Sequence, residues 1–178
     1  MIYGERIRLR APERDDIPLF VKWLNDPEVR RGLILYLPMS KADEEAWFEN
    51  MIKGPADEHP LVIEIRTDDD WKPIGNSGIH KIDWRNRSAE VGLFIGEKRL
   101  WNQGYGTEVM SLLLKHGFET LNLNRIGLQV YETNHGAIRA YEKAGFVHEG
   151  RFRQGVYIDG RYEDTLFMSA LREEWFKR

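Results

Sequence analysis

The sequence predicts a mixed α/β fold of the α+β type, formed by a single domain over residues 1–178. The length of 178 residues suits one domain. Segments with an apolar period of two alternate irregularly with segments of helical period. The predicted order is a strand, two helices, a run of strands, and then strand–helix–strand–helix–strand–strand. Consecutive strands in the middle of the chain favour an antiparallel run over a regular βαβ alternation.

The first third of the chain predicts one strand and two helices. Apolar residues alternate with arginines over 6–10, which predicts a short strand. Asp15 or Asp16 can cap a helix that runs to Leu24 and stops at Asn25-Asp26-Pro27. Ser40, with acidic residues three and four positions later, predicts the start of a second helix that ends near Gly54.

The remainder of the chain predicts the rest of the sheet. Strands are expected over 61–65, 73–84, 89–96 and 126–130, and helices over 106–121 and 134–144. Asp159-Gly160, flanked by β-prone residues, predicts a tight hairpin in the tail.

Composition excludes several classes of function. The formal net charge of −3 argues against a nucleic-acid binder. The chain has no cysteine, so thiolate catalysis, disulfides and cysteine-ligated zinc are excluded. The five histidines lack metal-site spacing, and no metal is expected. No signal peptide or apolar stretch of membrane-spanning length is visible, so we expect a cytoplasmic protein without membrane contact.

A glycine-rich loop follows the strand over 89–96 and opens the next helix. Gly104 and Gly106 allow close approach of the backbone to a ligand, and a helix N-terminus attracts anions. A dinucleotide-binding fingerprint would need a third glycine at Val109, and a P-loop would need Gly-Lys-Ser/Thr; neither is present. A simple turn remains the alternative for two glycines alone.

A second segment favours a functional role for this loop over a simple turn. It is Asn134-His135-Gly136-Ala137-Ile138-Arg139-Ala140-Tyr141-Glu142-Lys143-Ala144-Gly145-Phe146. Together the two segments resemble the GCN5-related N-acetyltransferase (GNAT) superfamily. The tail over 157–164 and the strand start over 87–90 resemble its branch of ribosomal-protein and spermidine N-acetyltransferases. Trp101 stands where the family loop often has Gln or Arg.

The resemblance implies a mostly antiparallel seven-stranded sheet flanked by about four helices, with a splay between the strands at about 89–96 and 125–131. It also implies that acetyl-CoA binds as co-substrate. The pantetheine arm would pair with the splayed strand, the pyrophosphate would lie on the glycine loop, and the helix after Asn134 would complete the site. The cofactor residues implied are Leu93, Phe94, Ile95, Asn102, Gln103, Gly104, Tyr105, Gly106, Thr107, Asn134, Ala137, Tyr141 and Lys143.

The resemblance assigns the chemistry to a few side chains. Tyr141 would be the general acid that protonates the departing thiolate, and a phenol with a pKa of about 10 is protonated at neutral pH. Asn134 would cap its helix and orient the reacting groups. Glu90 would accept a proton from the amine, directly or through water, with His80 as the alternative base.

The expected function is therefore acetyl transfer to a primary amine by direct transfer in a ternary complex. The acceptor is left open between a peptide N-terminus, an amino acid, a polyamine and a drug amine. The apolar loop over 33–38 weakens the polyamine alternative. A non-catalytic acyl-CoA-binding or regulatory module on the same fold is the second hypothesis, and a nucleotide-binding regulator the third. Dimers are common in the family, so the resemblance allows a homodimer.

Overall fold

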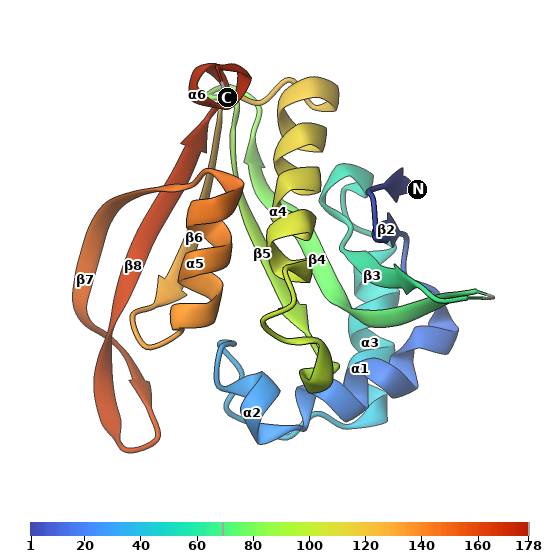
Figure 1. The fold of residues 1–178 in the computed structure, drawn as a ribbon. Helices are drawn as coiled ribbons and strands as arrows, with labels where there is room; N and C mark the ends of the chain where they lie inside the picture. The colour runs from blue at the N-terminus through green and yellow to red at the C-terminus, as the bar shows by residue number, and fades with distance from the viewer. Residues whose placement is uncertain (69, 178) are drawn as a thin grey trace.

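A computed structural model describes residues 1–68 and 70–177 and shows one eight-stranded sheet (Figure 1). The strand order is β1-β2-β3-β4-β5-β6-β8-β7, and the pair β5–β6 is parallel while the other pairs are antiparallel. The strands are β1 (Ile2–Tyr3), β2 (Ile7–Arg10), β3 (Leu61–Arg66), β4 (Trp71–Asp83), β5 (Ser88–Ile95), β6 (Arg125–Tyr131), β7 (Val147–Ile158) and β8 (Arg161–Leu171).

Helices cover the two faces of the sheet unequally. On one face, α4 (Tyr105–Lys115) and α5 (His135–Ala144) lie side by side over the main apolar core (Figure 1). On the opposite face, α1 (Ile17–Leu24) and α3 (Lys41–Met51) cover a smaller cluster that includes Val62 and Phe94. This second pair of helices packs near β3 to β5.

The expected splay between the two central strands is confirmed. β5 pairs with β6 only through Ser88, Ala89 and Glu90, whose partners are Arg125, Ile126 and Gly127. Beyond these three pairs β5 continues to Ile95 and β6 to Tyr131 without bonding to each other. One side of the β5 backbone from Val91 to Ile95 therefore has no strand partner in the described part of the chain, and it faces a gap inside the sheet.

The structure adds elements to the expected set. The sheet has eight strands and not seven, because the two-residue β1 pairs with β2. Two short helices, α2 (Pro27–Arg30) and α6 (Arg172–Phe176), raise the number of α-helices among the described residues from about four to six. The predicted helix end at Asn25-Asp26-Pro27 is confirmed, because α1 ends at Leu24. The sequence did not predict α2, which begins at Pro27 and is capped by the Asp26 side chain, which accepts a bond from the Glu28 N–H.

Two other boundaries differ from the prediction. The expected helix over 106–121 ends as α4 at Lys115 and continues as a π-helical turn over His116–Thr120. In the tail, Asp159 and Gly160 both have positive φ, as a two-residue hairpin turn requires. The strands that they join are far longer than predicted, because β7 is an exposed edge strand with two bulges and shows little apolar alternation.

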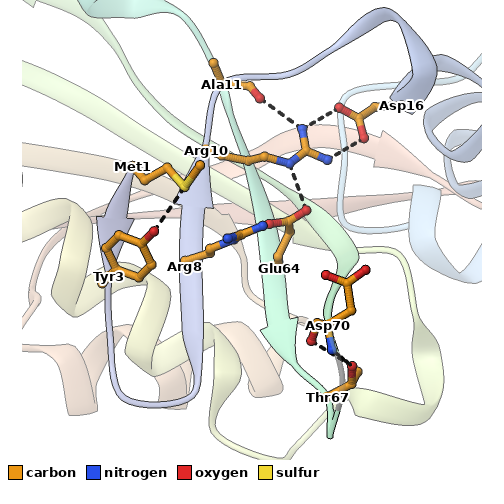
Figure 2. A network of polar contacts seen from close by, with 9 residues as sticks. All are labelled: Met1, Tyr3, Arg8, Arg10, Ala11, Asp16, Glu64, Thr67 and Asp70. Atoms are coloured by element: carbon orange, nitrogen blue, oxygen red, sulfur yellow. Dashed lines mark hydrogen bonds and ion pairs between the residues drawn. The ribbon is translucent and has the colours of Figure 1, made fainter.

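A buried ion-pair network fixes the start of α1 to the sheet (Figure 2). Glu64 is 4% exposed and accepts bonds from the guanidinium groups of Arg8 and Arg10, at 2.5 and 2.8 Å. Arg10 also donates two bonds to Asp16, each 2.7 Å. The Asp16 carboxylate in turn accepts a bond from the Glu13 backbone N–H, so it joins β2 to the turn before α1.

In the described part of the chain, none of the helices combines the length and the apolar character needed to cross a membrane.

Candidate active site

The glycine loop presents unpaired backbone donors at the start of α4. Gly104 is the N-cap residue, with φ of 87° in the left-handed region, and no side chain of the described residues caps this helix end. The first N–H groups of an α-helix have no partner within the helix. The amides of Tyr105, Gly106 and Thr107 are therefore available to an anion, as the sequence predicted for a pyrophosphate.

Arg6, which sequence reasoning did not select, holds this loop in place. Its guanidinium donates to the Gln103 carbonyl oxygen at 3.0 Å and to the Glu108 carboxylate at 3.0 Å. Its backbone N–H also donates to Glu108 at 2.8 Å. These partners lie about a hundred positions apart, so no local sequence signal could have found the contact. Glu108 is thereby occupied by an arginine and does not enter the anion site.

The open side of β5 offers only part of the predicted pantetheine strand. Successive residues of a strand direct their backbone groups to alternate sides. The Gly96 N–H bonds to β4, and the Phe94 carbonyl lies against Gly75 of β4. Leu93 and Ile95 therefore face the gap toward β6, whereas the Phe94 backbone does not.

Trp101 occupies one of the backbone groups of β5 that face the gap. Its indole Nε1 donates a 2.7 Å bond to the Ile95 carbonyl oxygen. Over residues 1–68 and 70–177, Leu93 is thus the β5 residue in the unpaired segment whose N–H and carbonyl are both left to pair with an extended arm in the gap. The unusual tryptophan also ties the end of the strand to the loop that begins at Asn102.

The start of α5 lies beside the glycine loop. The Asn134 side chain accepts a bond from the Ala137 N–H and caps the helix, as predicted. A Cβ at Gly136 would lie 3.5 Å from Oδ1 of Asn102, and one at Gly106 would lie 3.7 Å from Cβ of Ala140. Small residues thus allow the two N-terminal helix turns to meet. Lys143 is exposed in the last turn of α5, and its role as a cofactor residue stays a prediction.

Tyr141 lies inside this part of the molecule. It is 7% exposed, packs against Phe146, and belongs to the core beneath α4 and α5. Burial raises the pKa of Tyr141 to about 12, so the phenol stays protonated across the physiological range. Among the described residues its hydroxyl has no hydrogen-bond partner, and none of their fully buried side-chain oxygens is unpaired. Oη therefore has access to space outside the protein.

The two predicted bases lie on the other face of the sheet. His80 and Glu90 are cross-strand partners, with His80 Nε2 3.8 Å from a Glu90 oxygen. The same oxygen accepts a 2.9 Å bond from Lys81, so Glu90 is already engaged with a cation. A Cβ at Gly92 would lie 3.7 Å from the His80 ring, which places the imidazole next to the splayed segment. Burial lowers the pKa of His80, which favours a neutral ring that can accept a proton.

The arrangement separates an acid from a base across the gap. Side chains alternate between the faces of a strand, so Glu90 shares a face with Phe94 and the α1–α3 cluster. Tyr141 lies with α4 and α5 on the opposite face. A reacting group held in the gap could receive a proton from one face and give one up to the other. Within residues 1–68 and 70–177, no group of three or more His, Asp or Glu side chains could hold a metal.

Comparisons with known proteins agree with this geometry. The model of the acetyltransferase (GNAT) domain matches residues 6–147. The N-acetyltransferase p20 of Bacillus licheniformis is 30% identical, covering 98% of this chain and 97% of the relative. The putative ribosomal N-acetyltransferase YdaF of Bacillus subtilis is 27% identical, covering 97% and 94%.

A spermidine N(1)-acetyltransferase of Vibrio cholerae is 31% identical over 98% of both chains. The crystal structure of spermidine N-acetyltransferase from Vibrio cholerae in complex with CoA and spermine superposes with a TM-score of 0.88, at 26% identity, and covers 97% of this chain and 99% of that one. The family match covers most of the chain, and these relatives are N-acetyltransferases over their full length. The chain therefore belongs to the acetyltransferase (GNAT) domain family and is an N-acetyltransferase.

Proposed function

We propose that this enzyme transfers the acetyl group of acetyl-CoA directly to a primary amine in a ternary complex. The observation that carries the proposal is the gap between β5 and β6, which has unpaired backbone on its β5 side and opens beside the uncapped start of α4. An extended arm that ends in a pyrophosphate fits this combination. GNAT acetyltransferases use acetyl-CoA, and the Vibrio cholerae relative was crystallised with CoA.

Four parts of the chain would hold the co-substrate. The amides of residues 104–107 would receive the pyrophosphate, with Asn102 and Gln103 at the loop entrance. The Leu93 N–H and carbonyl would pair with the pantetheine arm, flanked by the Phe94 and Ile95 positions of β5. Asn134 and Ala137 would line the start of α5. When bound, acetyl-CoA supplies an activated thioester, whose acetyl carbon is open to attack by an amine.

The protein would then move two protons. An alkyl ammonium has a pKa of about 10.4, so it must lose a proton before its nitrogen can attack. His80 Nε2 accepts this proton, and Glu90 stabilises the imidazolium at 3.8 Å. On the opposite face, Tyr141 Oη gives its proton to the departing sulfur as the C–S bond breaks, and the phenolate then takes up the second proton, which the nitrogen loses as the amide forms. Asn134 holds the start of the helix that carries Tyr141.

The acceptor is a primary amine on a small molecule or a peptide. The classes under consideration are peptide N-termini, amino acids, polyamines and drug amines. The similarity to relatives named spermidine acetyltransferases favours a small amine as the acceptor of this enzyme. The exposed side chains of Ile34, Tyr36 and Leu37 leave an apolar surface on the loop after α2, which suits an acceptor with hydrocarbon parts.

Calorimetry with acetyl-CoA, followed by a thiol-release assay with a panel of amines and short peptides, tests the proposal. We expect saturable binding of acetyl-CoA and release of free CoA that depends on an amine. Absence of acetyl-CoA binding at millimolar concentration would refute the proposal.

We also propose a cytoplasmic enzyme, since acetyl-CoA is an intracellular metabolite, and a homodimer. The exposed aromatic side chains of Phe152, Tyr157 and Tyr162 on β7 and β8 support an interface there. Cell fractionation tests the first point. Sedimentation of the wild type against a Phe152→Ser variant tests the second, and a wild type that sediments as a monomer at assay concentration would exclude the dimer.

A further inference from the structure

A hollow of about 230 Å³ lies on the sheet face opposite to α4 and α5, at the point where β5 and β6 stop being paired. In Figure 1 this is the far face, because α4 and α5 cover the near one. We call this space the vertex hollow. The lining residues that matter here are Lys81 of β4, Glu90 of β5, Arg125 and Gly127 of β6, Glu149 of β7 and Phe167 of β8.

Gly127 is the reason that this part of the sheet is hollow. It pairs with Glu90 on one side and Ser169 on the other, and it has no side chain to fill the face between them. Its φ lies outside the left-handed region. Among the described residues, a Cβ at Gly127 would meet two atoms within 4 Å, the carbonyl oxygens of Met168 at 3.7 Å and Ala89 at 4.0 Å. Neither strain nor crowding therefore requires glycine here, and a glycine inside a strand often marks close approach of a ligand.

An acetyl-CoA arm in the gap would end at the vertex hollow. The anion site at the start of α4 lies beyond the C-terminal end of β5, so an arm that pairs with Leu93 runs back toward Glu90. Glu90 lies three residues before Leu93, which is about 10 Å along a strand. There β5 and β6 are paired through Glu90 and Gly127, so the arm cannot continue between the strands.

The acyl group must therefore leave the gap through one face of the sheet. On the face of α4 and α5 the space is filled, because Val91, Ile126 and Leu128 are 4%, 0% and 4% exposed and belong to the main core. On the other face the vertex hollow is open beside Glu90. An acyl group turned to that face brings its carbonyl carbon toward the His80–Glu90 pair, while the sulfur stays in the gap.

The vertex hollow is larger than an acetyl group needs. With a water's share of the liquid at about 30 Å³, the space equals about seven or eight water molecules, whereas an acetyl group has about three heavy atoms. Room is therefore left for a longer acyl chain.

The lining of the vertex hollow suits an uncharged chain. Lys81 donates a 2.9 Å bond to Glu90, and Arg125 donates a 2.6 Å bond to Glu149. The two cations and two anions of the lining are thus already paired, and a charged ligand would have to open one of these pairs. The Phe167 ring and the aliphatic stems of Lys81 and Arg125 supply apolar surface.

We propose that the vertex hollow is an acyl pocket that admits uncharged straight chains of about three or four carbons, so that the enzyme transfers propionyl and butyryl groups as well as acetyl. The inference rests on the proposed function and deepens it by naming the class of acyl donor. The transfer step is the same: the amine nitrogen bonds to the acyl carbon, and the C–S bond breaks with its electron pair going to sulfur. The protons follow the routes given for acetyl transfer, and the added methylenes take no part.

A comparison of donors tests the inference. Acetyl-, propionyl-, butyryl- and succinyl-CoA are compared in the thiol-release assay with the best amine, the product mass is measured, and a reaction without amine controls for hydrolysis. We expect kcat/KM for propionyl- and butyryl-CoA to lie within about tenfold of the acetyl-CoA value, because a pocket closed around acetyl rejects each added methylene by about tenfold or more. Values further below for both donors would overturn the inference.

Succinyl-CoA tests the charge of the chain. Its carboxylate meets ion pairs that are already formed, so its kcat/KM should be at least about tenfold below that of butyryl-CoA. A preference for succinyl-CoA over butyryl-CoA would overturn the assignment to uncharged acyl groups.

Substitution of Gly127 separates the vertex hollow from the rest of the site. Gly127→Val adds a branched side chain that strands favour, and it should lower the ratio of kcat/KM for butyryl-CoA to that for acetyl-CoA by about tenfold or more. Gly127→Ala should lower the ratio less, and it serves if valine disturbs the sheet. Gly150→Val on β7, where a Cβ meets nothing within 4 Å in the described part of the chain, is the matched control and should keep the wild-type ratio. Equal ratios in the wild type and both Gly127 variants would contradict the inference.

Calorimetry without an amine decides the inference apart from catalysis. We expect the wild type to bind butyryl-CoA with a Kd within about threefold of that for acetyl-CoA, and Gly127→Val to weaken butyryl-CoA binding about fivefold more than acetyl-CoA binding. Absence of binding by both donors at millimolar concentration would refute the proposed function itself. Binding and turnover of acetyl-CoA alone would refute only the acyl pocket.

Discussion

Arg6 and Glu108 lie 102 positions apart in the chain and meet at 3.0 Å, through the guanidinium Nε and a carboxylate oxygen. Because Arg6 also donates to the Gln103 carbonyl, one side chain joins the turn before β2 to the loop and to the first helical turn of α4. The shape of the proposed anion site therefore depends on a residue near the start of the chain.

We expect Arg6→Ala to raise KM for acetyl-CoA about threefold to tenfold, with a smaller effect on kcat. The change removes two bonds that hold the loop, and net hydrogen-bond contributions of about 1 kcal/mol correspond to this range. Steady-state kinetics at saturating amine measure it. Arg66→Ala, at an exposed end of β3, is the matched control. An unchanged KM would show that the loop keeps its shape without Arg6.

Tyr141→Phe should lower kcat by about a hundredfold or more, the usual range for loss of a general acid. KM for acetyl-CoA should change little, because the ring and its packing against Phe146 remain. Since burial raises the pKa of Tyr141 to about 12, wild-type activity should show no loss from phenol ionisation up to about pH 10. Tyr3→Phe, at an exposed tyrosine, is the control. Full turnover in Tyr141→Phe, with chemistry limiting, would exclude the acid role.

The pH dependence of kcat/KM distinguishes His80 from Glu90 as the base. Burial lowers the pKa of His80 below its ordinary 6.5, whereas the charge of Glu90 raises it. The acid limb of the profile should therefore lie below pH 6.5 and move further down in Glu90→Gln. His80→Gln should lower the rate and remove this limb. A limb that survives in His80→Gln and disappears in Glu90→Gln would assign the base to Glu90.

The Glu149–Arg125 pair should make stability depend on acid pH. The bonds from Arg125 and Ser169 hold the pKa of Glu149 at about 2, below the ordinary 4.5. Its stabilisation is thus present above pH 4.5 and is lost as pH falls toward 2. Both side chains are about 40% exposed, so solvent screening limits the effect of Glu149→Gln to about 1 kcal/mol at pH 7. Urea unfolding should be measured at pH 7 and in acid. The difference in the free energy of unfolding between the wild type and the variant should be smaller in acid.

Glu64→Gln should destabilise the fold by about 3 kcal/mol, because it leaves Arg8 and part of Arg10 without a counter-charge in a largely buried site. Thermal unfolding measures this change, and Glu173→Gln on the exposed last helix is the control. A loss no larger than that of the control would mean that water replaces the missing charge.

Local signals predicted the elements that local bonds define. The cap at Asn134, the Ser40–Asp43 box and the Asp159-Gly160 turn each lie within a few residues, and the structure confirms all three. The splay and the assignment of chemistry to Tyr141 came from the family resemblance and not from periodicity. The helix stop at Asn25-Asp26-Pro27 is also confirmed, whereas the four-residue helix that begins at Pro27 was not predicted, since proline both disfavours a helix before it and favours one after it.

Contacts between distant segments could not be predicted from the sequence. Nothing near Arg6 indicates Glu108, and nothing around Gly127 indicates that Lys81 and Glu149 would line the vertex hollow. The bond from Trp101 to Ile95 likewise depends on how the loop turns back along the strand. The sequence therefore predicts where the co-substrate loop lies better than it predicts what surrounds the acyl group.

The three residue pairs that join β5 to β6 have a mechanical consequence. They connect a five-stranded part and a three-stranded part of one sheet, so the backbone hydrogen bonding between the two parts is incomplete at the centre of the sheet. An extended ligand arm that bonds to Leu93 would add hydrogen bonds in the gap and stabilise the two parts of the sheet against each other. Amide hydrogen exchange at Leu93 should then slow, and the unfolding temperature should rise with ligand concentration. We therefore expect the sheet of this enzyme to be stiffest while the co-substrate is bound.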